Sequence, residues 1–184
     1  MKFWASLIGY QLVWFAAVIG AGRGLAWPGV VGMLIYVACQ LAVARHWKAD
    51  LSLLATAAVF GLLLDGGLIH WKLTSYTAPW PSAAIAPAWI LALWITFALT
   101  FTQSLAWLQT RLWLAALLGL IGGPLAYLGA SRGWQVVRFA DPAWHGLLCL
   151  GLGWALATPA LAWLARRRSA SAAPLSISLQ GHAP

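Results

Sequence analysis

Long apolar runs separated by short polar or charged breaks dominate the pattern of this 184-residue chain. Six runs can be marked, at residues 3–21, 27–44, 51–69, 85–108, 112–130 and 143–165. Each is close to the roughly 20 apolar residues that a helix needs to cross a bilayer. The runs are continuous and do not alternate with a period of two, which excludes a membrane β-barrel. The pattern therefore predicts an all-α, polytopic membrane protein, a bundle of six transmembrane helices.

The six runs are expected to form one transmembrane domain over residues 1–168. From Ser169 onward the sequence is rich in Ser, Ala and Pro, so residues 169–184 are predicted to form a disordered cytoplasmic tail. Two longer connections, at 70–84 and 131–142, join the third run to the fourth and the fifth to the sixth. No internal repeat of 20–50 residues is visible.

The composition supports this class of protein. The chain is 62% hydrophobic and only 8% charged, and its mean hydropathy is +0.82. Soluble domains carry about 25% charged residues, so most of this surface is expected to face lipid. The net charge of +8 would suggest a nucleic-acid partner in a soluble protein. Here the basic residues lie almost entirely between or after the apolar runs, where they orient the chain in the membrane, and no nucleic-acid partner is predicted.

The distribution of basic residues predicts the orientation. With six spans, one side holds seven basic residues: Lys2, Arg45, Lys48, Arg111, Arg166, Arg167 and Arg168. The other side holds four: Arg23, Lys72, Arg132 and Arg138. Both termini are therefore predicted to be cytoplasmic.

Two further patterns predict packing between helices. Small residues recur every four positions in the first, fifth and sixth runs, as in Ala115, Gly119 and Gly123, which lets helix backbones approach closely. Trp14, Trp94 and Trp154 lie deep in their runs, unlike most of the tryptophans, and are expected to pack between helices.

The candidate site begins at Asp65, because an ionisable side chain inside a membrane segment is costly and marks a functional position. Under the predicted orientation Asp65 lies in the outer half of the third helix, with His70 at its outer end. Tyr127 and Arg132 close the fifth helix on the same side, and His145 begins the sixth. These five residues are predicted to form a ligand-binding cluster at the outer mouth of the bundle, able to hold a head group or move a proton.

Alternative roles for these residues remain open. Asp65 could pair with a neighbouring Arg or cap a broken helix while the histidines lie at the interface. A metal site is disfavoured because no HxxH or HxxxH spacing occurs, and no metal or cofactor is predicted. The P-loop, HExxH and CxxC motifs are all absent from the sequence.

The sequence also resembles a known family. The resemblance rests on Asp65-Gly66-Gly67, Pro87-Ala88-Trp89, Leu93-Trp94, Phe97-Ala98-Leu99-Thr100, Leu118-Gly119 and the run Gly122-Gly123-Pro124-Leu125-Ala126-Tyr127-Leu128-Gly129. These segments are similar to bacterial inner-membrane proteins grouped as domain of unknown function 2878, and the resemblance covers most of the chain. It implies a bacterial inner-membrane location. Family members are often encoded beside fatty-acid-modifying enzymes, which implies a link to membrane lipid.

The leading hypothesis is an accessory membrane protein that binds or handles a lipid or other amphiphile at its outer half. Its expected partners are membrane lipid and a membrane protein or lipid-modifying enzyme. Two alternatives stay open: a small membrane-embedded enzyme using Asp65 and a histidine as acid and base, and a compact proton-coupled transporter. The sequence fixes neither the ligand nor the oligomeric state.

Overall fold

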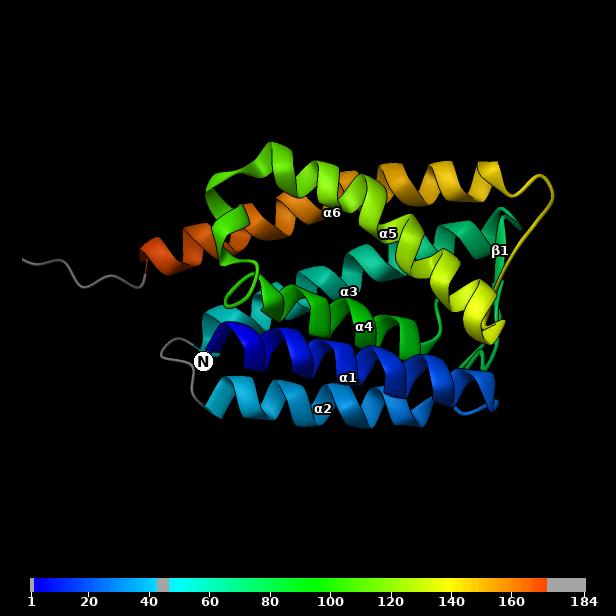
Figure 1. The fold of residues 1–184 in the computed structure, drawn as a ribbon, viewed down its shortest axis with the longest axis horizontal. Coiled ribbons are helices and arrows are strands. Elements are labelled where there is room, and N and C mark those ends of the chain that lie inside the picture. Colours follow the sequence, from blue (N-terminus) through cyan, green and yellow to red (C-terminus); the bar gives the residue numbers. More distant parts are fainter. Residues whose placement is uncertain (1, 43–46, 172–184) are drawn as a thin grey trace, which may run out of the picture.

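Six α-helices make up almost all of the structure, a computed structural model that describes residues 2–42 and 47–171. The elements in chain order are α1 (Lys2–Gly22), α2 (Trp27–Ala42), α3 (Trp47–His70), β1 (Thr74–Tyr76), α4 (Ala88–Thr100), the 3₁₀-helix η1 (Ala106–Thr110), α5 (Leu112–Trp134), β2 (Val137–Phe139) and α6 (Trp144–Ser171). Successive helices run in opposite directions along the bundle (Figure 1). The all-α class predicted from the sequence is confirmed.

Four of the described helices are long and apolar enough to cross a membrane, judged by length and composition. These stretches are Phe3–Gly22, Asp50–His70, Leu112–Trp134 and Trp144–Arg167. The other two, α2 and α4, are shorter apolar helices. The chain thus has the helices expected of a membrane protein.

The sequence predicted one helix over the fourth apolar run, residues 85–108, and this prediction is wrong. Helix α4 ends at Thr100, and the chain then turns into η1. The Thr100 and Thr102 hydroxyls donate to the carbonyls of Phe97 and Leu99, at 2.6 and 2.8 Å. Such local side-chain bonds offer the backbone an alternative to continuing the helix. The turn itself stays buried at Phe101, so an apolar composition alone did not reveal it.

Other boundaries differ less. Residues 43 and 44, the end of the second apolar run, lie outside the described residues. Helix α6 continues to Ser171, past the point where the sequence suggests the tail begins. Residues 172–184 are not described.

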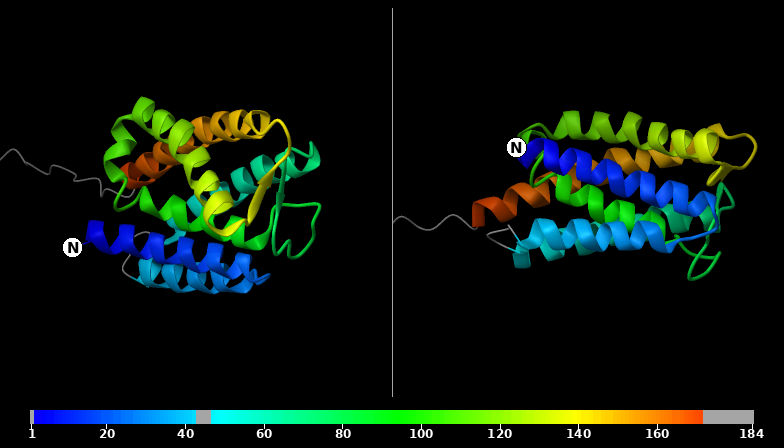
Figure 2. Two further views of the ribbon diagram at one scale, coloured as in Figure 1. Left: turned by 45° about the vertical axis from the view of Figure 1, so that its right-hand side comes forward. Right: turned by 60° about the horizontal axis from the view of Figure 1, so that its bottom comes forward.

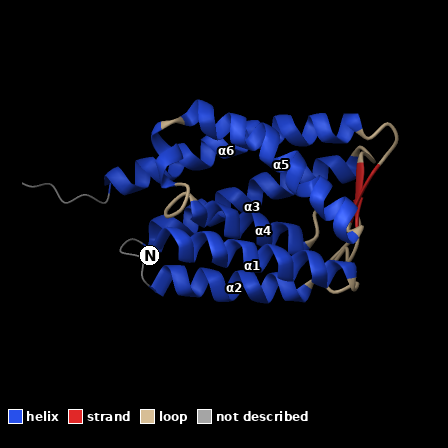
Figure 3. Cartoon of the chain, viewed as in Figure 1, coloured by secondary structure: helices blue, strands red, loops and turns tan. Residues whose placement is uncertain are grey.

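A short two-stranded sheet ties the two longer connections together at one end of the bundle (Figure 3). Strands β1 and β2 are antiparallel, with Thr74 opposite Phe139 and Tyr76 opposite Val137. Their three residues each are too few to give a recognisable alternating pattern in the sequence. We call this end, where α3 and α5 finish and α4 and α6 begin, the strand end. The opposite end, which holds the start of α1, is the terminal end.

Helix α4 lies at the centre of the bundle, against α1, α2 and α3. Its position explains why Trp89, Trp94 and Leu99 are almost completely buried. Helices α5 and α6 pack together on one side and α1 and α2 on the other, as the views in Figure 2 also show. The contact between α5 and α6 is the most extensive of all. A Cβ added to Gly119 would collide with the carbonyl of Trp154, which confirms the close helix packing predicted from the small residues.

Candidate functional site

Asp65 lies within α3, about 7–8 Å along the helix axis from its last residue, His70. Its side chain has no exposed surface. Because α3 is continuous through Asp65, the alternative that this residue caps a broken helix is wrong.

Three neutral donors hold the Asp65 carboxylate. Tyr76 and Tyr127 each donate their hydroxyl to Oδ1 at 2.7 Å, and the Trp94 indole N–H donates to Oδ2, also at 2.7 Å. All three distances fall within the range of well-formed hydrogen bonds, and such bonds are stronger when the acceptor is ionised. The donors come from β1, α4 and α5, so one carboxylate joins four elements of the fold. We call these four residues the Asp65 cluster.

Tyr76 is positioned by the sheet. Its backbone pairs with Val137 of β2, and the Thr74 hydroxyl donates to the Tyr76 hydroxyl oxygen at 3.3 Å. Burial, followed by the nearby charge of Asp65, raises the pKa of the Tyr76 phenol well above its ordinary value. Tyr76 therefore keeps its proton and remains a donor to the carboxylate.

Trp94 is positioned by close packing. Its indole stacks on that of Trp154, with ring centroids 3.9 Å apart and an interplanar angle of 13°. A Cβ on Gly61 would lie 2.5 Å from Cδ1 of Trp94, and a Cβ on Gly123 would collide with the Trp154 ring. These two glycines make the slot in which the stacked indoles fit. Both tryptophans thus pack between helices, as the sequence predicted.

Of the five residues predicted for the site, the structure brings two together, Asp65 and Tyr127. His70, Arg132 and His145 are exposed at the strand end. No hydrogen bond or ion pair within the described ranges joins them to Asp65, and the His145 ring lies instead against Trp144, with centroids 3.8 Å apart. In the part of the chain that is described, no group of three His, Cys, Asp or Glu side chains converges as a metal site would require.

Two members of the cluster, Tyr76 and Trp94, were missed by reasoning from the sequence, which looked for charged partners of Asp65. One signal in the sequence could have pointed to them: few basic side chains lie at the same membrane depth as Asp65. A buried carboxylate with no cation beside it needs neutral donors, and Tyr and Trp are the ones that an apolar segment tolerates.

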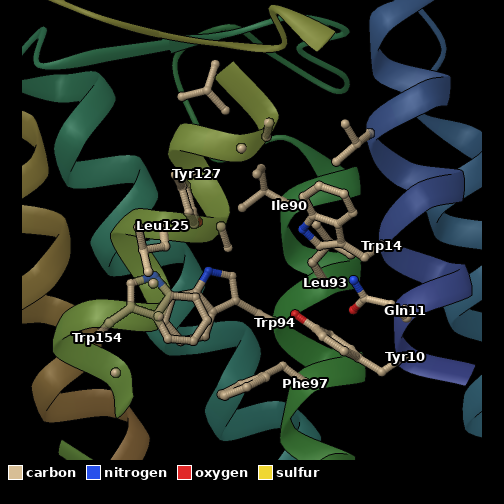
Figure 4. A pocket seen from close by; sticks show the side chains of 18 of the residues that line it. Tyr10, Gln11, Trp14, Ile90, Leu93, Trp94, Phe97, Leu125, Tyr127 and Trp154 are labelled. Atoms are coloured by element: carbon tan, nitrogen blue, oxygen red, sulfur yellow. The ribbon is translucent and has the colours of Figure 1, made fainter. Parts of the chain in front are cut away.

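A cavity of about 520 Å³ lies on the other side of Trp94 and Tyr127, between α1, α4, α5 and α6 (Figure 4). Aromatic and aliphatic side chains form most of its wall, including Tyr10, Trp14, Leu93, Phe97, Leu125 and Trp154. We call this cavity the aromatic groove. Trp94 and Tyr127 belong to both features, because each bonds to Asp65 and also lines the groove.

The groove is polar at a few points and carries no full charge. Asp, Glu, Lys, Arg and His are absent from the described residues that line it. Tyr10 and Gln11 line it from α1 (Figure 4), and Gln11 is exposed. The Trp154 indole nitrogen is buried without a hydrogen-bond partner among the described residues.

A second polar cluster near the terminal end is self-contained. Tyr36 of α2 bonds to the Ser6 hydroxyl of α1 at 3.0 Å, and Ser6 bonds to Ser104 at 3.3 Å. Gln40 donates to Tyr36 at 3.1 Å. These bonds link α1, α2 and the turn after α4, as hydrogen bonds between polar side chains commonly do in helical membrane proteins. An adjoining cavity of about 550 Å³ lies between α1 and α2.

Comparison with known proteins identifies the family. The family model described as "Protein of unknown function (DUF2878)" matches residues 3–160, and the chain therefore belongs to this family, as its sequence suggested. No curated protein and no solved structure matches the chain.

Proposed function

We propose that this family member is a multi-pass protein of the bacterial inner membrane that binds an amphiphile in the aromatic groove. In this proposal α2 and α4 complete six spans and both termini face the cytoplasm. The strand end, with the Asp65 cluster, then lies on the outer side. The protein acts as an accessory factor that holds or presents the amphiphile to a membrane partner.

The observation that carries the proposal is the groove itself. Its volume of about 520 Å³ falls within the range of small-molecule sites, which are mostly apolar with a few polar groups. It is lined by exposed apolar side chains of α5, such as Leu118 and Leu125. An amphiphile can therefore reach the groove from the side, directly from the lipid.

The Asp65 cluster supports a structural role within this function. Each of its three donors already bonds to the carboxylate, and no histidine contacts it in the described part of the chain. An acid–base pair or a proton-transfer route through Asp65 and a histidine has no support in this arrangement. We assign Asp65 to holding Trp94 and Tyr127 in the groove wall.

The test is to fill the groove without disturbing the helices. A Cβ on Gly122, which lines the groove, would meet only Leu118 Cδ1 at 3.9 Å, so a side chain can begin there without a clash, and Gly122→Leu adds bulk at the groove. Gly133 is the matched control, because it lies on the same helix, outside the groove, with no atom within 4 Å of an added Cβ.

The measurement is native mass spectrometry of protein freshly extracted from membranes in a mild detergent. Wild type and Gly133→Leu are expected to retain a bound amphiphile, and Gly122→Leu to lose most of it while unfolding at the same temperature. If wild type retains none, or if all three proteins retain equal amounts, the groove is not the binding site.

A further inference from the structure

We infer, on the basis of the proposed function, that the amphiphile carries an uncharged carbonyl group and that this group lies at mid-membrane depth against Tyr10 and Gln11. The inference concerns the chemical class of the ligand. It follows from three properties of the aromatic groove: its depth, its lack of charge and its uncommitted donors.

The depth follows from the position of Tyr10 in α1. The helix runs from Lys2 to Gly22, which places Tyr10 about 12 Å along the axis from the first residue and about 18 Å from the last. The polar head of a phospholipid stays at the membrane surface, far from this point. The polar group that Tyr10 and Gln11 meet must therefore be one that tolerates the hydrocarbon interior.

The lack of charge narrows the class further. No acidic or basic side chain is among the described residues lining the groove. A phosphate, a carboxylate or a quaternary ammonium placed there would lose its hydration without gaining an opposite charge, and an unpaired buried charge is very costly. The ligand's polar group is therefore neutral.

The uncommitted donors point to an acceptor. The Tyr10 hydroxyl and the Gln11 amide make no hydrogen bond to any residue that the structure describes. Figure 4 shows the Tyr10 hydroxyl directed toward the interior of the groove, with the Gln11 amide beside it. A carbonyl only accepts hydrogen bonds, so it complements the Tyr10 hydroxyl and the Gln11 amide NH₂ together.

A quinone ring with a hydrophobic tail and the ester of a fatty acid are two kinds of membrane molecule that present such a group. The flat aromatic walls, with Phe97 and Trp154 in edge-to-face contact at 5.2 Å, accommodate either. The shared chemistry is the neutral carbonyl, and the experiment separates its two sources.

The test measures binding of four probes by native mass spectrometry after removal of the endogenous amphiphile. The probes are decylubiquinone, methyl palmitate, palmitate and hexadecyltrimethylammonium. We expect at least one of the two neutral carbonyl probes to bind at least about tenfold more tightly than either charged probe. In the double variant Tyr10→Phe/Gln11→Leu this binding should weaken by about tenfold, the effect of losing one to two hydrogen bonds. Gln103→Leu, which lies in the cavity between α1 and α2, is the control and should bind as wild type.

The inference is overturned if a charged probe binds as tightly as the neutral ones, or if the double variant binds the carbonyl probes as wild type does. It is also overturned if wild type retains its endogenous amphiphile but neither carbonyl probe can replace it. That outcome leaves the proposed function intact. Absence of both endogenous amphiphile and probe binding removes the proposed function and the inference together.

Discussion

The Asp65 cluster and the aromatic groove lie on opposite sides of the same two side chains, Trp94 and Tyr127, and they differ in how their polar groups are used. In the cluster, all three donors bond to one carboxylate at 2.7 Å. In the groove, Tyr10 and Gln11 have no hydrogen-bond partner in the described structure. Satisfied groups stabilise a fold, whereas spare groups in a cavity are available to a ligand.

The difference also explains why an acid is present in a chain so poor in acids. Asp65 joins α3, β1, α4 and α5, which otherwise meet mainly through apolar contacts. Such contacts fix helix positions weakly in lipid, because hydrocarbon tails are as apolar as the side chains. A carboxylate with three directed donors selects one arrangement, and that arrangement sets the groove wall.

Loss of the carboxylate should have the largest effect on stability. Asp65→Ala leaves the hydroxyls of Tyr76 and Tyr127 and the Trp94 N–H buried without an acceptor, which should lower the free energy of unfolding by at least about 3 kcal/mol. Thermal unfolding in detergent measures this change. Asp141→Asn, which alters an exposed acid, is the control and should unfold as wild type. Equal stability of Asp65→Ala and wild type would remove the structural role of the cluster.

The slot for the stacked indoles should also be sensitive to substitution, with an effect similar to that of losing one hydrogen bond of the cluster. Gly61→Ala brings a Cβ to 2.5 Å from Trp94, and overpacking of this kind costs about 1–3 kcal/mol. On the same helix, Gly66→Ala meets nothing within 4 Å and should stabilise the protein slightly, by up to about 1 kcal/mol. Chemical denaturation of both variants checks the sign, and identical effects would show that the slot does not constrain Trp94.

Substitutions of the two tyrosines of the cluster should affect stability alike but amphiphile binding differently. Tyr76→Phe and Tyr127→Phe each remove one hydrogen bond to the carboxylate, so each should destabilise the protein by about 1.5–3 kcal/mol. Only Tyr127 also lines the groove, so only Tyr127→Phe should change the amount of bound amphiphile. Native mass spectrometry beside thermal unfolding measures both properties. If Tyr76→Phe changed the amount of bound amphiphile as strongly as Tyr127→Phe, the Asp65 cluster and the aromatic groove would not be functionally distinct.

The smallest effect on stability is expected for Tyr10→Phe. The Tyr10 hydroxyl makes no hydrogen bond to the described residues, so its removal should change the free energy of unfolding by less than about 0.5 kcal/mol. Thermal unfolding of ligand-free protein is the measurement. A large loss of stability would mean that this hydroxyl is committed to the fold and not available to a ligand.

The sequence predicted the helical class, and it located Asp65 and Tyr127, because both depend on local signals: long apolar runs and a polar group inside one. It did not predict Tyr76 as a partner, because that contact depends on the pairing of two three-residue strands that are distant in sequence. The sequence analysis placed His70, Arg132 and His145 in the site only because their predicted depth in the membrane is similar to that of Asp65. Their exposure shows that depth does not determine which direction a side chain faces.

The length of the fourth helix could not be predicted for a different reason. The turn after Thr100 is stabilised by side-chain bonds to the backbone within a buried, apolar environment. The apolar composition of this run indicates that it is buried, but it does not reveal these hydrogen bonds. The run was therefore predicted to form one continuous helix.

The central claim, that the aromatic groove holds an amphiphile, is tested most directly by where a photoreactive acyl probe labels the protein in membranes. Mapping the labelled residues by mass spectrometry should find the label concentrated at the groove, on residues such as Tyr10, Trp14 and Leu125. The amount of label at the groove should decrease in the Gly122→Leu variant. Equal labelling of exposed side chains outside the groove, such as Leu34 and Leu156, would show only contact with bulk lipid and contradict the account.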